Sequence, residues 1–64
     1  MASLKQLNNL IIKGHHWAVE SIAWELKNNG VNLSMAIATA IAYEDQNGDD
    51  GKEILEILNR VVYG

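Results

Sequence analysis

The chain contains no cysteine and no proline among its 64 residues, and it has only four aromatic residues, two tryptophans and two tyrosines. Without cysteine it has neither a disulfide framework nor a thiolate zinc site, which stabilise many chains of this length. A chain near 60 residues buries only about 60% of the surface that it exposes when unfolded. We therefore expect one small domain, residues 1–64, stabilised by association with a second copy.

Basic residues are also few. Five Lys and Arg stand against eight Asp and Glu, a net charge of −3, which is unsuited to nonspecific binding of phosphate backbones. The acidity is concentrated near the carboxyl terminus, where residues 44–64 contain six acidic residues against Lys52 and Arg60.

Long apolar runs are missing as well. The longest, Leu33 to Tyr43, covers 11 positions and is interrupted by Ser34 and Thr39, whereas a membrane-spanning helix needs about 20. The first residues do not have the order of basic, apolar and small residues that marks a secretory signal. These features predict a cytoplasmic protein that does not span a membrane.

The residues that are present favour helices. Apolar residues make up 48% of the chain, and glycines divide it into three periodic segments, predicted as helices at about 3–28, 33–46 and 50–63. Ser3 and Gln6 form a capping-box pattern at the first helix start, and Asn29-Gly30 predicts its end. Gly14 lies inside this segment and costs about 1 kcal/mol relative to Ala, so a break is an alternative to a continuous helix.

The other two predicted helices differ in polarity. The second has apolar residues in nearly every direction around its axis, which predicts a helix surrounded by protein. The third follows a possible Asp50 cap and has one apolar face, with Glu56 and Arg60 spaced for an ion pair outside it. The apolar residues of this face are Ile54, Leu55, Ile57, Leu58, Val61 and Val62.

Helix lengths then predict a dimer. A continuous first helix of about 26 residues spans roughly 39 Å, and the other two span roughly 20 Å each. The apolar residues at its amino end would lack a local partner; they are Leu4, Leu7, Leu10, Ile11 and Ile12. The predicted fold is all-α, a three-helix chain forming a homodimeric bundle with a two-fold axis.

Tryptophans mark the predicted interface. Leu10, Trp17 and Trp24 recur every seven residues, beside a second stripe that begins at Ile11. The tryptophans either anchor a target protein, as Trp often does at binding hot spots, or fill the core or the dimer interface. The predicted partner or dimer interface is formed by Leu7, Leu10, Ile11, Trp17 and Trp24.

Metal-binding patterns are incomplete. His16 and Glu20 are spaced to supply two ligands from one helix face, but zinc sites need at least three. The run 45–56 resembles a calcium loop of the EF-hand or dockerin kind, with Asp45, Asn47, Asp49 and Glu56 at ligand positions. Asp50 stands where that loop needs Gly, and Lys52 stands at its apolar position. The same residues also fit a simple turn followed by an acidic helix start, and we predict no metal or other cofactor.

Catalysis and DNA reading lack the required side chains. No serine or histidine has an adjacent partner that would activate a nucleophile, and no glycine-rich phosphate loop is present. A helix-turn-helix across Gly30 would present Met35 to Ala40, which contain no residue that reads base edges. The function expected from this elimination is a non-catalytic protein-binding module, a homodimeric regulator, adaptor or inhibitor of another protein. The alternatives are a calcium-responsive module using 45–56 or a DNA-associated accessory factor.

Overall fold

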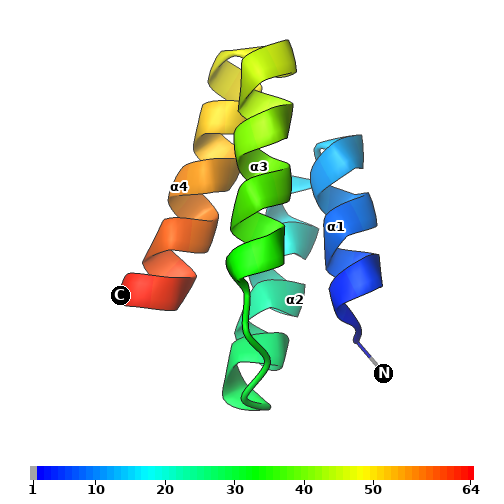
Figure 1. The fold of residues 1–64 in the computed structure, drawn as a ribbon, viewed down its shortest axis with the longest axis vertical. Helices are drawn as coiled ribbons and strands as arrows, with labels where there is room; N and C mark the ends of the chain where they lie inside the picture. Colours follow the sequence, from blue (N-terminus) through cyan, green and yellow to red (C-terminus); the bar gives the residue numbers. More distant parts are fainter. Residues whose placement is uncertain (1) are drawn as a thin grey trace.

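Four helices account for most of the chain. The computed structural model describes residues 2–64, which contain no strand and form α1 (Leu4–Lys13), α2 (His16–Asn28), α3 (Ser34–Asn47) and α4 (Asp49–Tyr63). Successive helices run in opposite directions along the long axis (Figure 1). The all-α class is confirmed, but the predicted count of three helices is wrong.

The difference arises at Gly14, where the predicted helix 3–28 divides into α1 and α2. Gly14 has φ +74° and ψ 26°, and its N–H donates to the Ile11 carbonyl at 3.0 Å, while the His15 N–H donates to the Leu10 carbonyl at 3.2 Å. Glycine adopts this left-handed conformation without the steric cost of a Cβ and is therefore the usual helix terminator. The chain reverses here, so α1 folds back beside α2. At the other end of α1 the predicted Ser3 cap is confirmed, because Ser3 Oγ accepts from the Gln6 N–H at 3.1 Å.

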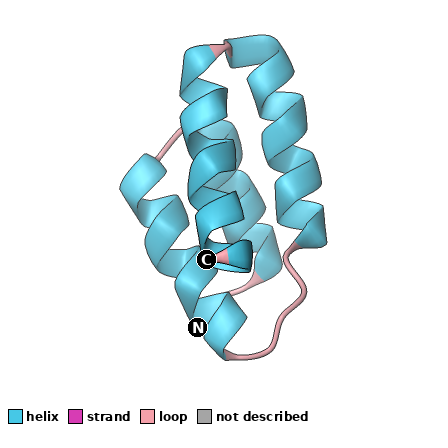
Figure 2. Ribbon diagram, turned by 90° about the vertical axis from the view of Figure 1, so that its left-hand side faces the viewer, coloured by secondary structure: helices cyan, strands magenta, loops and turns pink. Residues whose placement is uncertain are grey.

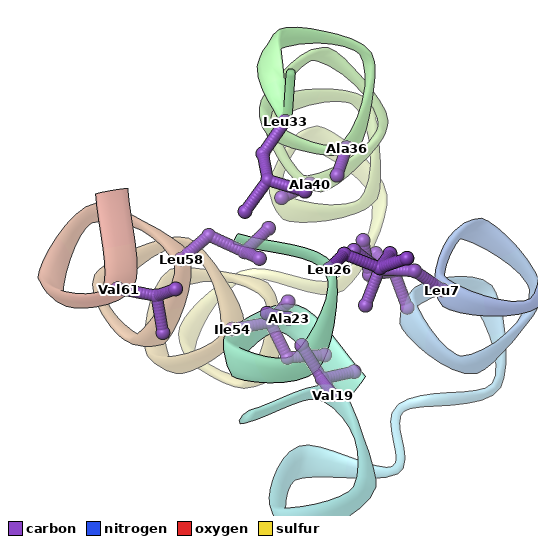
Figure 3. Close-up of a cluster of buried hydrophobic side chains, with 11 residues drawn as sticks. Leu7, Val19, Ala23, Leu26, Leu33, Ala36, Ala40, Ile54, Leu58 and Val61 are labelled. Carbon is purple, nitrogen blue, oxygen red and sulfur yellow. The ribbon is translucent and has the colours of Figure 1, made fainter. Parts of the chain in front are cut away.

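The helices occupy the four corners of a bundle. α1 and α4 each pack against both α2 and α3. Seen along the bundle, α2 and α3 therefore lie at opposite corners, and the connection 29–33 carries the chain across one end between them (Figures 2 and 3). One face of α2 and one face of α3 point away from the other helices as a result.

The core lies along the bundle axis and is entirely aliphatic (Figure 3). Leu7 and Ile11 of α1 are fully buried within the single chain, and Leu10 packs beside them. The apolar residues of α1 therefore have local partners, and the prediction of a dimer from helix length loses its basis. In this fold Leu7 and Ile11 are not accessible to another chain. Within residues 2–64, the buried core residues are Leu7, Ile11, Val19, Ala23, Leu26, Leu33, Ala36, Ala40, Ile54, Leu58 and Val61.

α3 is buried on one face only. Ala36 and Ala40 have no exposed surface, whereas Ala38 and Ala42 are exposed. The chain by itself does not surround this helix, so the prediction that protein covers it on all sides depends on a second chain and stays a prediction. Its apolar residues form an inner face against the core and a second, outer face.

α3 and α4 come closest where they are joined. Gly48, with φ +63°, is the only residue between them, and α4 begins directly at Asp49. Asp50 therefore lies inside the helix, and the predicted cap at Asp50 is wrong. One turn along, Gly51 is buried, and a Cβ there would lie 2.6 Å from the Glu44 backbone nitrogen and nearer still to its Cα. The two backbones are in contact at this point, which only glycine permits.

This contact predicts the effect of Gly51→Ala. In an ordinary helix the change adds about 1 kcal/mol of stability, but here the methyl group meets backbone, and overpacking costs about 1–3 kcal/mol. We expect a lower free energy of unfolding in urea denaturation. Lys52→Ala on the same turn is the control, because Lys52 is exposed and its removal should change stability by less than about 0.5 kcal/mol. A more stable Gly51→Ala protein would contradict the close approach.

Candidate functional site

Exposed large apolar side chains gather on the outer faces of α2 and α3. On α2, Trp17 is 80% exposed and Trp24 is 38% exposed. On α3, Met35 is 61% exposed and Ile41 is 48% exposed. We call Trp17 and Trp24 the tryptophan face, and Met35, Ala38, Ile41 and Ala42 the α3 face. α2 and α3 occupy opposite corners of the bundle (Figure 3). Because both faces lie on the side of their helix away from the core, they are directed to opposite sides of the molecule.

Trp24 is held in place by Lys27. The Lys27 ammonium lies 5.2 Å from the centroid of the Trp24 ring, a cation–π distance. The same ammonium donates hydrogen bonds to the carbonyls of Val61 and Val62, the latter at 3.4 Å, near the carboxyl end of α4. These carbonyls lie in the last turn of α4, where backbone acceptors have no partner within the helix. Lys27 therefore orients Trp24 and joins the ends of α2 and α4.

Trp17 has no comparable partner among the residues that the structure describes. It lies two turns before Trp24 on the same side of α2, and four-fifths of its surface faces solvent. Apolar surface of this size gains free energy when it is removed from water, at about 25 cal/mol per Å². Of the predicted interface residues, Trp17 is thus the most accessible, whereas Leu7 and Ile11 lie in the core.

The α3 face is uncharged and continues onto α1. No charged residue occurs between Leu33 and Tyr43. Beside this face, an open groove between α1 and α3 is lined by Ile12, Thr39, Ala42, Tyr43, Gln46 and Asn47. The Thr39 hydroxyl donates to the Met35 carbonyl at 3.0 Å, so it does not present an unpaired polar group at the groove.

A third group of side chains lies where α2 and α4 begin. His16 Nδ1 is 3.0 Å from Glu53 Oε2, and one ligand atom from each of His16, Asp50 and Glu53 lies within 4.8 Å of the others. Glu20, the predicted companion of His16, instead points to Arg60, with 3.8 Å between its Oε2 and the Arg60 Nη1. Sequence reasoning missed the His16–Glu53 pair because it depends on α2 and α4 packing side by side. The i,i+3 spacing of Asp50 and Glu53 was visible, but no local pattern indicated which helix they face.

The predicted calcium ligands do not converge. α4 begins at Asp49, so the second half of the supposed loop is helical, and Glu56 lies two turns after Asp49. Within residues 2–64, the cluster of His16, Asp50 and Glu53 is the one group of three such side chains that is close enough to share an ion. Asp45 and Glu56 are not part of it. The alternative prediction, a Gly48 turn followed by an acidic helix start, matches the structure.

Comparison with known proteins adds no information on function: no family model, curated protein or solved structure matches the chain. No helix in the described part of the chain has the length and apolar character needed to cross a bilayer.

The contacts of Lys27 predict that Lys27→Met destabilises the fold. The variant keeps most of the aliphatic chain but removes two hydrogen bonds from a charged donor and a cation–π contact, together about 1–3 kcal/mol. The free energy of unfolding from chemical denaturation, followed by tryptophan fluorescence, measures the loss. Lys13→Met is the matched control, since Lys13 also lies in the last turn of a helix but is exposed. Equal effects of the two substitutions would show that the Lys27 contacts contribute nothing specific.

Proposed function

We propose that this chain is a non-catalytic adaptor: it pairs with a second copy through the α3 face and binds a target protein through the tryptophan face. The observation that carries the proposal is the 80% exposure of Trp17 on a helix whose opposite face is in the core. A small chain with four aromatic residues leaves one of its two largest side chains in water. Burial of such a residue against another protein removes a large apolar surface from water and so contributes favourably to the free energy of binding.

The tryptophan face fits an apolar cleft on another protein. Tryptophan is enriched among the few residues that dominate protein interfaces, because it offers a large apolar surface with few rotatable bonds. α2 also contains the acidic residues Glu20 and Glu25 and the basic residue Lys27, so a partner with charged residues of both signs around its cleft complements this helix. Nucleic acid is a poorer fit, because the chain has only five Lys and Arg against eight Asp and Glu.

A second copy is the best occupant for the α3 face. In a two-fold contact each patch meets the same patch of the other copy, so a charged patch would bring like charges together. Two chains that each have a net charge of −3 also repel each other, so an uncharged surface is the most favourable place for them to meet. Ala38 and Ala42, one turn apart, let another helix approach closely. Met35 and Ile41 supply the larger apolar surface beside them.

The opposite directions of the two faces favour an adaptor over an inhibitor. Pairing through α3 leaves the tryptophan face of each copy uncovered on the outside of the dimer. Such a dimer engages two targets, or two sites on one target, and the second contact benefits from a high effective concentration. Self-association and target binding then do not compete for surface.

The dimer predicts a mass of twice the 7.1 kDa chain in size exclusion with light scattering at tens of micromolar. Ala38→Glu should give a folded monomer, because a two-fold contact brings two buried like charges together, at a cost of several kcal/mol. The control is Asn59→Glu, an exposed α4 position outside the α3 face, which should remain dimeric. A helical wild-type monomer at that concentration would exclude this part of the proposal.

The target site predicts that Trp17→Ser abolishes capture of a protein that wild-type chain recovers from its native host. Tyr63→Ser is the control, because Tyr63 is an equally exposed aromatic residue on α4. With the purified target, calorimetry should show a Kd increase of about 30-fold for Trp17→Ser, the effect of losing about 2 kcal/mol. If the Kd of the Trp17→Ser variant is unchanged, or if Tyr63→Ser weakens binding equally, the tryptophan face is not the target-binding site.

A further inference from the structure

We infer that His16, Asp50 and Glu53 form a binding site for a divalent transition-metal ion, with zinc as its best representative. His16 is the first residue of α2, and Asp50 and Glu53 lie in the first two turns of α4, a helix that packs against α2. One nitrogen and two carboxylate oxygens lie within 4.8 Å of one another. This proposal is independent of the adaptor function, because it concerns neither exposed face.

The donor set selects the class of ion. Zinc is bound in proteins by imidazole nitrogen and carboxylate oxygen, and its open sites have three protein ligands and a water. Calcium takes six to eight oxygen ligands, so a site with one imidazole and two carboxylates does not satisfy it. The site is therefore of a different class from the calcium loop considered from the sequence, and it shares none of that loop's predicted ligands.

The three side chains are free to adjust. Asp50 and Glu53 are exposed and His16 is half-buried, so small rotations bring the donors to coordination distance without a change in the core. The His16–Glu53 contact of 3.0 Å already holds the imidazole and one carboxylate together.

The surrounding charge also favours a cation. Glu44 and Asp45 lie in the last turn of α3, where the helix end is itself partly negative and no basic residue lies in the same turn. The Glu44 backbone lies against Gly51, which follows Asp50 directly, so these two carboxylates are at the same end of the bundle as the site, although Lys52 lies there too. The helix starts of α2 and α4 carry partial positive charge and oppose an ion, so binding depends on direct ligation by His16 and the two carboxylates.

Ligation would connect parts of the chain that are distant in sequence. His16 precedes Asp50 by more than 30 residues, and the two come together only in the folded bundle. An ion bound here stabilises the folded state over the unfolded one and raises the melting temperature. It would act as a cross-link in a chain that has no disulfide.

The test uses the full chain after chelator treatment, with zinc chloride as the added ligand. Calorimetry should give one ion per chain with a micromolar Kd, and a melting curve should rise by several degrees, reversed by EDTA. Calcium chloride should produce neither effect. Nickel provides a spectroscopic readout, because a bound paramagnetic ion should quench the fluorescence of Trp17, which adjoins His16.

Matched variants locate the ion. His16→Ala and Glu53→Gln should each raise the zinc Kd at least 10-fold, whereas His15→Ala and Glu56→Gln should leave it within two-fold. Far-UV circular dichroism confirms that each variant is folded, and His16→Gln replaces His16→Ala if that protein is not. Absence of a zinc-dependent melting shift in the wild-type chain, or an unchanged Kd in the folded His16 and Glu53 variants, overturns the inference.

Discussion

The burial of Leu7 and Ile11 of α1 against the other helices is the interaction on which the remainder of the fold depends. It is possible because Gly14 takes a left-handed conformation and returns the chain along α2. Without that reversal, α1 would not cover the core, and the aliphatic side chains on that side would be exposed to water. With it, a chain of 64 residues closes a core without disulfides.

The same closure determines which surfaces remain exposed. Placing α1 and α4 between α2 and α3 puts the latter two at opposite corners, with one face of each directed outward (Figure 3). Small side chains at Ala36 and Ala40 allow α3 to lie close to the core, and Gly51 allows α4 to approach α3. The apolar residues of α2 and α3 that do not fit into the core are therefore exposed on the tryptophan face and the α3 face. The proposed adaptor function follows from their opposite directions.

Charge is distributed in a related way. The two apolar faces lie on the sides of the bundle, while acidic residues gather where α3 ends and α4 begins. Because α2 begins near the same end, His16 is brought to Glu53 and Asp50. The proposed ion site and the two proposed protein contacts use different residues of one rigid unit. Each can therefore be removed by substitution without altering the others.

The sequence by itself determined the helical class, the Ser3 cap and, to within one residue, the limits of α3 and α4, predicted at 33–46 and 50–63 and found at Ser34–Asn47 and Asp49–Tyr63. These depend on local patterns of apolar spacing, glycine and capping residues. Tertiary structure decided the break at Gly14. A single glycine lowers the stability of a continuous helix by only about 1 kcal/mol, which is too little to break it. The larger contribution comes from the burial of Leu7 and Ile11, which is possible only when the chain reverses. It likewise decided that Trp17 faces water and that His16 meets Glu53. Those outcomes depend on which helix packs beside which, a choice made by the core as a whole and not encoded in any single stretch of the chain.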